Sequence, residues 1–149
     1  MRHIRQAQAT DHQAVVACVR AAYSKYLARM DKEPAPLYAD YEALIAQAVV
    51  SVLAKGEAVQ GVLVMMLQEN CFCVENIAVD PCFQGQGLGK MLMAFVEQQA
   101  RKEHVKEIRL YTNEVMTENL LFYQKLGFEE EDRRMQDGYR RVFLHKVLA

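Results

Sequence analysis

Apolar residues in the first part of the chain recur with the period of an α-helix. Between residues 15 and 27, valines, alanines and tyrosines return every three or four positions, which predicts a helix that begins near Asp11. Residues 10–13 match the capping box that often starts a helix. The polar, proline-containing segment 31–36 breaks the period, and a second, short helix is predicted over residues 38–46.

Runs of apolar and β-branched residues, bounded by turn residues, predict strands. Residues 55–57, Lys-Gly-Glu, separate two such runs as in a hairpin, and Asp137-Gly138 is a strong two-residue hairpin signal before the last run. The strands are predicted over residues 3–7, 49–54, 58–67, 71–79, 107–112, 130–135 and 139–147.

Helical spacing returns twice in the second half of the chain, over residues 88–103 and over residues 120–126, where Gly127 suits the left-handed cap position. Strand, glycine loop, helix and strand form a crossover, which implies two parallel neighbouring strands. The order βααβββαβαββ predicts a single α+β domain over residues 1–149. Its sheet of about seven strands is mixed but mostly antiparallel, with a central parallel pair and about four flanking helices.

Composition and charge exclude several classes of protein. Hydrophobic residues make up 52% and charged residues 25% of the chain, as in an ordinary globular domain. The net charge of −1 gives no large field that would attract nucleic acid or an anionic membrane. The start lacks a secretion signal, and the longest apolar stretch, residues 62–67, is too short to span a bilayer. A cytoplasmic protein without nucleic-acid or membrane partners is expected.

The cysteines do not form a recognisable metal or redox motif. Cys18, Cys71, Cys73 and Cys82 include no C-x-x-C pair, and a reducing cytosol would keep them as thiols. The four histidines are scattered, and no H-E-x-x-H motif is present. The sequence therefore predicts no metal site.

A glycine-rich loop, Gln84-Gly85-Gln86-Gly87-Leu88-Gly89-Lys90, lies where a predicted strand ends and a helix begins. Unpaired N–H groups at a helix start, together with glycines, suit an anion such as pyrophosphate. A nucleotide P-loop would need glycine at Gln84 and a hydroxyl at Met91, and a dinucleotide fingerprint would need glycine at Lys90. Both alternatives fail, whereas a turn that merely joins strand to helix remains possible.

The loop resembles the cofactor motif of the GNAT family of N-acetyltransferases, Q/R-x-x-G-x-G/A after a strand, which Gln84, Gly87 and Gly89 match. Residues 77–81 and 119–128 extend the resemblance, as does the order of elements. The resemblance implies acetyl-coenzyme A as co-substrate and parallel strands that splay apart after a bulge. It implies the following cofactor-binding residues: Ile77, Ala78, Val79, Gln84, Gly85, Gln86, Gly87, Leu88, Gly89, Lys90, and Asn113 or Asn119.

The two asparagines enter because many family members carry asparagine where this chain has Met116. Either could replace that contact to the pantetheine arm, or be a capping or surface residue. Asn119 lies one turn before Tyr123 on the predicted helix, so both could face the cofactor. Asn76 could add polarity to the strand edge or serve only as a turn former.

Acetyl transfer to an amine needs a base, a stabilised oxyanion and an acid for the departing thiolate. By resemblance Tyr123 is the acid, although it could also be a core aromatic. Glu75 interrupts an apolar strand and is the candidate base, although it could equally face solvent or pair with a lysine. Main-chain N–H groups around residues 77–79 would stabilise the oxyanion.

The expected reaction is direct acetyl transfer to a primary amine of a small molecule or peptide. Residues 29–41 are expected to border the acceptor pocket, and the charges at 129–134 and at Arg140-Arg141 are interpreted as solvated or cross-strand charges. In the resembling family the final hairpin often pairs with a copy of itself, so a homodimer is expected. The alternatives are a non-catalytic acyl-coenzyme A sensor and an interaction module on the same scaffold.

Overall fold

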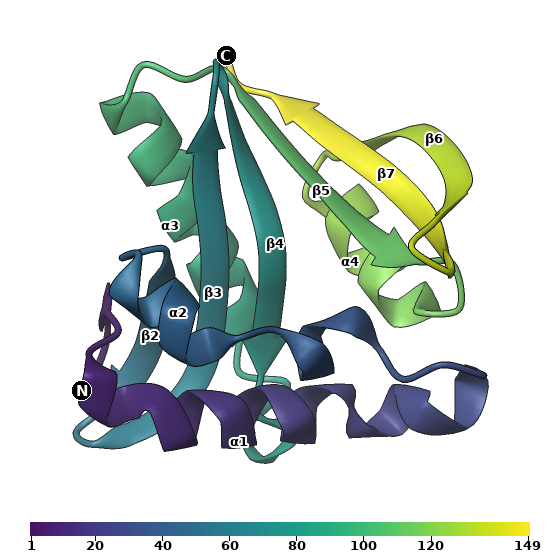
Figure 1. Ribbon diagram of the computed structural model, residues 1–149. Coiled ribbons are helices and arrows are strands. Elements are labelled where there is room, and N and C mark those ends of the chain that lie inside the picture. Colours follow the sequence, from purple (N-terminus) through teal and green to yellow (C-terminus); the bar gives the residue numbers. More distant parts are fainter.

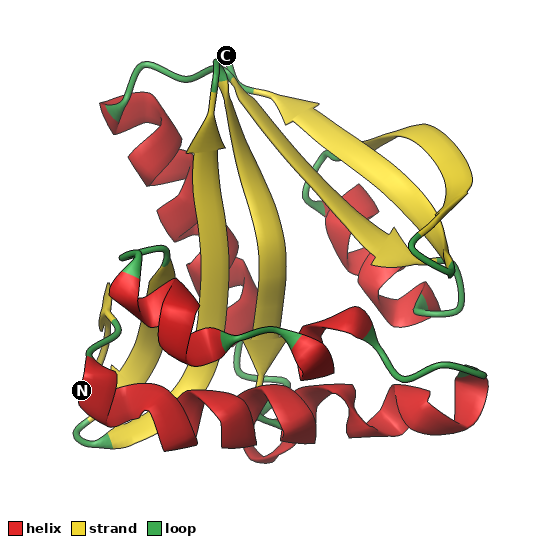
Figure 2. Ribbon diagram, viewed as in Figure 1, coloured by secondary structure: helices red, strands yellow, loops and turns green.

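The computed structural model describes residues 1–149 and contains one seven-stranded sheet, with the strand order β1-β2-β3-β4-β5-β7-β6 (Figures 1 and 2). All neighbouring strands are antiparallel except β4 and β5, which form the predicted parallel pair. The strands are β1 (Arg2–Gln6), β2 (Val50–Lys55), β3 (Ala58–Gln68), β4 (Cys71–Val79), β5 (Glu107–Asn113), β6 (Glu129–Gln136) and β7 (Tyr139–Val147).

Helices cover both faces of the sheet (Figure 1). One hydrophobic core lies between the sheet and α1 and α2, on the face called the front below, and the other lies between the sheet and α3 and α4 at the back. The α-helices are α1 (His12–Tyr23), α2 (Tyr41–Ala46), α3 (Leu88–Lys102) and α4 (Thr117–Lys125), and the short 3₁₀ turns are η1 (Ala9–Asp11), η2 (Ser24–Arg29), η3 (Ala35–Tyr38) and η4 (Pro81–Phe83). No helix is both long and apolar enough to cross a membrane.

The start of the first helix differs from the prediction. The expected capping box over residues 10–13 is wrong, because Asp11 supplies the side chain that caps the preceding turn. Its carboxylate accepts the Gln8 backbone N–H at 2.7 Å and two hydrogen bonds from the Arg5 guanidinium, at 2.7 and 3.0 Å. A charged acceptor paired with an arginine makes stronger hydrogen bonds than a neutral threonine hydroxyl.

The segment between α1 and α2 is also less helical than predicted. The α-helix ends at Tyr23 and continues as the 3₁₀ turn η2, and α2 begins at Tyr41 rather than at residue 38. Asp40 caps α2 by accepting the Ala43 N–H at 3.1 Å. Pro34 and Ala39, on either side of the 3₁₀ turn at residues 35–38, have ψ values of 136° and 146°, so non-helical residues separate this turn from the helical segments before and after it.

The sheet opens between its two parallel strands. β4 and β5 pair only from Cys71 with Glu107 to Val74 with Leu110. At the next residue β4 has a bulge: Val74 and Asn76 pair with successive residues of β3, so Glu75 has no partner there. Beyond it β4 and β5 diverge, and α1 and η2 run across the open end (Figure 1). The bulge turns the strands apart and thereby creates the site described below.

The last helix and the free edge follow the sequence patterns. Gly127 adopts a φ of +94°, and the Phe128 N–H donates to the Tyr123 carbonyl at 3.0 Å, as in the predicted helix cap. The edge strand β6 carries charged residues from Glu129 to Arg134, and charges on an edge discourage indiscriminate strand pairing. The homodimer through the final hairpin stays a prediction.

Candidate active site

A cavity of about 310 Å³ lies where β4 ends, between the glycine loop, the end of α1 and α4. All the predicted cofactor residues except Gln86 and Asn113 line this cavity, which we call the glycine-loop cavity. Its lining residues are Ala22, Tyr23, Lys25, Tyr26, Ile77, Ala78, Val79, Gln84, Gly85, Gly87, Leu88, Gly89, Lys90, Asn119, Phe122 and Tyr123.

The glycine loop leaves space for a ligand. Gly85 and Gly87 have φ values of +82° and +77°, and a Cβ atom built on either would meet no atom within 4 Å. The Met91 N–H makes the first helical bond of α3, to the Gly87 carbonyl at 3.0 Å, which leaves the preceding N–H groups available. A Cβ on Gly89 would lie 3.1 Å from the Phe122 ring, so this glycine lets α3 approach α4. The loop therefore fits a pyrophosphate.

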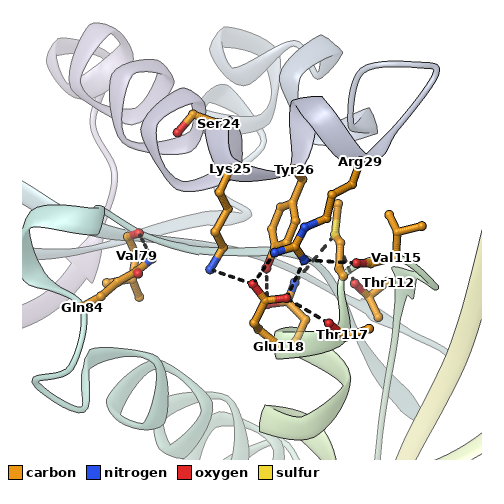
Figure 3. Close-up of polar contacts among 12 residues, drawn as sticks. Ser24, Lys25, Tyr26, Arg29, Val79, Gln84, Thr112, Val115, Thr117 and Glu118 are labelled. Atoms are coloured by element: carbon orange, nitrogen blue, oxygen red, sulfur yellow. Dashed lines mark hydrogen bonds and ion pairs between the residues drawn. The ribbon is translucent and has the colours of Figure 1, made fainter.

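The diverging edge of β4 presents backbone groups to the same cavity. The Tyr23 hydroxyl lies 3.5 Å from the Ile77 carbonyl. Gln84 Nε2 donates to the Val79 carbonyl at 3.4 Å, as Figure 3 shows. Within a strand the N–H and C=O of one residue point to the same side, so the N–H groups of Ile77 and Val79 also face the gap. These donors and acceptors suit an amide-bearing chain.

Tyr123 lies at the inner wall of the glycine-loop cavity. It is 4% exposed and packs against Phe122 and Phe128, with ring centroids 5.2 and 5.7 Å away. Burial raises the pKa of the Tyr123 phenol well above its ordinary value, so the hydroxyl stays protonated at physiological pH. A neutral phenol at this place can donate a proton to a group in the cavity.

Ion pairs fix η2 on α4 at the rim of this cavity (Figure 3). Glu118 accepts hydrogen bonds from Arg29 at 2.6 and 2.9 Å, and Lys25 lies 3.9 Å away. The Arg29 hydrogen bond is the main reason why the Glu118 pKa falls to about 2. Three residues before Arg29, the Tyr26 hydroxyl donates to Oδ1 of Asn119, the residue after Glu118, at 3.4 Å. The contacts hold two lining residues, Tyr26 and Asn119, in place.

Two predicted cofactor residues, and Met116 at the position of the missing family asparagine, have other neighbours. Asn113 lies outside the glycine-loop cavity and its side chain accepts the Val115 N–H at 3.1 Å. The Gln86 side chain accepts from the Arg2 guanidinium. Met116 is buried, and its sulfur accepts the Thr112 hydroxyl at 3.4 Å. Of the two asparagines considered for the missing family contact, Asn119 is therefore the one beside the cavity.

Glu75 lies outside the glycine-loop cavity, on the front of the sheet. Three other hollows, of about 190, 370 and 40 Å³, are each lined by both Glu75 and Tyr111, and we call them the Glu75 hollows. The Tyr111 hydroxyl donates to Glu75 Oε2 at 3.3 Å. Tyr23 lines both the smallest hollow and the glycine-loop cavity, so its ring separates the two regions.

Asn76 connects the elements around this boundary. It is 6% exposed, accepts the Tyr23 hydroxyl at 2.7 Å and donates to the Tyr41 oxygen at 3.0 Å. The Tyr41 hydroxyl in turn donates to the Pro36 carbonyl at 2.6 Å. The sequence analysis treated Tyr23 as an apolar helix position and Tyr41 as part of the segment 29–41, and it missed the hydrogen bonds of both hydroxyls. The signal that could have revealed these contacts is that a buried tyrosine hydroxyl needs a hydrogen-bond partner.

The segment between α1 and α2 lies over the β6–β7 hairpin. The Tyr139 hydroxyl donates to the Glu33 carbonyl at 2.5 Å, and Lys32 Nζ donates to the Asp137 carbonyl at 2.8 Å. Ala35 and Pro36 line two of the Glu75 hollows. This segment therefore borders the Glu75 hollows, and its place beside the acceptor stays a prediction.

A buried arginine and a cluster of charged residues lie beside the Glu75 hollows. Arg141 was interpreted as a solvated or cross-strand charge; at 7% exposed it is not solvated, but its guanidinium does donate across the hairpin to Gln136 of β6. It lies under aromatic rings, which shield it from water. Glu107, Glu131 and His145 have potential ligand atoms within 4.8 Å of one another. Arg109 pairs with both carboxylates, so the cluster already contains a cation.

Comparison with known protein families identifies one that matches this chain. Residues 46–130, more than half of the chain, match the Acetyltransferase (GNAT) domain. These residues include the bulge, the diverging strand, the glycine loop and Tyr123. The chain therefore belongs to the GNAT acetyltransferase domain family.

Two curated relatives match shorter segments. An uncharacterized N-acetyltransferase, ycf52, of Gracilaria tenuistipitata var. liui is 43% identical over 72 residues, which are 48% of this chain and 36% of that protein. Glucosamine 6-phosphate N-acetyltransferase of Trypanosoma brucei brucei is 35% identical over 63 residues, or 42% and 41% of the two chains. The matches thus span well under half of these relatives.

A solved structure extends the likeness over the whole fold. The PaiA N-acetyltransferase of Thermoplasma acidophilum, in complex with coenzyme A, superimposes with a TM-score of 0.84. The alignment covers 99% of each chain at 19% sequence identity. At this identity, the likeness shows a shared fold.

Proposed function

We propose that this protein transfers the acetyl group of acetyl-coenzyme A directly to a primary amine of a small molecule or peptide, in a ternary complex. The observation that carries the proposal is the opening between β4 and β5, where the glycine-loop cavity and the Glu75 hollows lie on the two sides of Tyr23, which lines both. A co-substrate and an amine can then approach from the two sides. The names of the two curated relatives, both N-acetyltransferases, support the same reaction.

The glycine-loop cavity fits the co-substrate. N–H groups at the start of α3 would bind its pyrophosphate, and the edge of β4 at Ile77 and Val79 would bind the amides of its pantetheine arm. Lys25 and Lys90 line the same cavity and add positive charge. The bound molecule supplies an activated acetyl thioester.

Residues of the chain would act as the general base and the general acid of the reaction. Glu75, directly or through a water, accepts the proton that the amine must lose to become a nucleophile. The new C–N bond forms as the C–S bond breaks, and N–H groups facing the gap near Ile77 stabilise the carbonyl oxygen. Tyr123 donates its proton to the departing sulfur and is reprotonated, through water, by the second proton that the nitrogen loses as the amide forms. The products are an N-acetylated amine and free coenzyme A.

The decisive experiment measures thiol release from acetyl-coenzyme A during incubation with a panel of amines, with mass spectrometry of the acetylated product. We expect amine-dependent release that stops when either substrate is omitted. Binding of acetyl-coenzyme A without release for any amine would contradict the proposal and favour a sensor. Absence of binding would favour an interaction module.

A further inference from the structure

Arg141 is a buried cation that the proposed chemistry does not use. It lies on β7 opposite Asn113 of β5, and its side chain is 8% exposed. The side chain of the preceding residue, Arg140, is 72% exposed. Burial of a guanidinium costs free energy unless acceptors or an anion compensate it. The surroundings of Arg141 therefore indicate what it can bind.

The chain offers hydrogen-bond acceptors to only one of the three nitrogens of this guanidinium. Nη1 donates to the neutral Gln136 amide oxygen at 2.6 Å and lies 3.4 Å from Asp137, whose side chain is 76% exposed. Nε and Nη2 donate no hydrogen bond within the chain, although a guanidinium has five N–H groups. These atoms are not sealed in the core, because the only fully buried side-chain nitrogen or oxygen without a partner is His145 Nδ1. Donors therefore remain available to a ligand.

Aromatic rings hold the guanidinium in place. Its central carbon lies 4.2 Å from the Tyr111 ring centroid and 5.4 Å from that of Tyr139. Such contacts stabilise a cation and fix a flexible side chain before a ligand arrives. Tyr111 is also the residue that donates to Glu75, so the carboxylate and the guanidinium lie around one ring.

The space beside Arg141 fits a small acidic group. The hollow of about 40 Å³ is lined by Arg141, Glu75, Tyr111, Thr112 and Asn113, among others. A water requires roughly 10–15 Å³ by this measure, so the hollow is large enough for a carboxylate. The larger hollow of about 190 Å³ shares Glu75 and Tyr111 with it and leaves room for the rest of the molecule.

We infer that the acceptor is a small molecule with both an amine and an anionic group, a carboxylate or a phosphate, and that Arg141 binds the anion while the amine lies at Glu75. The inference rests on the proposed acetyl transfer at this site. Glu75 alone would repel such an acid, whereas the adjacent guanidinium forms charge-assisted hydrogen bonds with it. Arg141 would thus determine specificity and take no part in proton transfer.

Matched amines test the inference. Wild-type kcat/KM is measured for β-alanine against β-alaninamide, glycine against glycinamide, and O-phosphoethanolamine against ethanolamine. We expect at least one acid to exceed its neutral analogue by about 10- to 100-fold, mainly through KM. The first two pairs report on a carboxylate and the third on a phosphate.

Variants assign the preference to Arg141. Arg141→Gln should abolish it while retaining activity toward the neutral amines, which also shows that the variant is folded. Arg141→Lys should restore part of it, and Arg140→Gln, the exposed control, should leave it unchanged. Equal wild-type rates for acids and neutral analogues, or an equal loss for both in Arg141→Gln, would overturn the inference and leave the proposed function intact.

A separate measurement is needed if the wild-type protein releases no thiol with any amine. In that case the proposed function fails, and calorimetric titration of the same acids in the presence of coenzyme A decides the inference. Binding that Arg141→Gln abolishes would support an anion site at Arg141. Binding that is absent, or unaffected by the substitution, would refute it.

Discussion

The glycine-loop cavity and the Glu75 hollows lie on either side of Tyr23 but are assembled differently. The cavity takes most of its lining from two continuous segments, 77–90 and 119–123. The hollows combine residues from β3, β4, β5, β7 and the segment between α1 and α2. A continuous segment places the same backbone groups around a common ligand, whereas a composite wall can change one residue at a time. The first region therefore suits a shared co-substrate, and the second determines the individual acceptor.

The sharpest test of this division is removal of the Tyr123 hydroxyl. Tyr123→Phe keeps the ring and its packing, so turnover should fall by about 10²–10⁴-fold while stability and acetyl-coenzyme A affinity change little. Steady-state kinetics, calorimetry and thermal unfolding measure the three quantities. Tyr41→Phe is the contrast, because it loses a buried hydrogen bond to Pro36 and should lose stability. A less stable but fully active Tyr123→Phe would mean that another group protonates the sulfur.

On the other side of Tyr23, Glu75→Gln removes the candidate base. We expect a loss of about 10²–10³-fold in turnover at neutral pH, with unchanged co-substrate binding. The deficit should narrow as the pH rises toward the amine pKa, about 10.4 for a lysine-like amine, because the nucleophile then needs no base. Pre-steady-state rates against pH measure this. Glu57→Gln, in an exposed turn, is the control. A constant deficit at every pH would assign Glu75 a positioning role instead.

A charge in the glycine loop should affect only the co-substrate. Gly87→Glu places a negative side chain where the pyrophosphate is expected, and acetyl-coenzyme A affinity should fall by about 10- to 100-fold by calorimetry. Gly56→Glu is a matched control, since Gly56 also has a positive φ, +61°, and open space around its Cβ position. Both variants carry backbone strain, so only a difference in affinity between them supports the loop assignment. Equal affinity would refute it.

The sequence analysis succeeded where function depends on neighbouring residues. The glycine loop, the parallel pair around it and the cap at Gly127 follow from short patterns with local physical causes. The burial of Arg141 was missed because it depends on Tyr111 of the neighbouring strand β5, which only the sheet register brings near. The break at the end of α1 was missed because a 3₁₀ turn keeps nearly the same apolar spacing as an α-helix.

The boundary between the two regions can be weakened through Asn76. Asn76→Ala leaves the Tyr23 hydroxyl without its partner at 2.7 Å and the Tyr41 oxygen without a donor, which should cost about 1–3 kcal/mol of unfolding free energy. Urea denaturation measures the change. Asn70→Ala, in the exposed turn before β4, should cost far less. If the two variants were equally stable, the network would contribute nothing to the fold.

The smallest effect concerns the ion pairs that fix η2 on α4. The pKa of Glu118 is lowered to about 2, mainly by Arg29. A carboxylate whose folded pKa is depressed stabilises the fold above its unfolded pKa, about 4.3 for glutamate, and this contribution is lost as the pH falls toward 2. Wild type should therefore unfold at a slightly higher temperature than Glu118→Gln at pH 7, and the difference should shrink between pH 5 and 2. Because Glu118 is exposed, solvent screening keeps the difference small.

Glu103→Gln, which breaks no ion pair, should show no such pH dependence. A difference that persists unchanged at pH 2 would mean that Glu118 acts through packing rather than charge, and the rim of the glycine-loop cavity would then be held mainly by the contact between Tyr26 and Asn119.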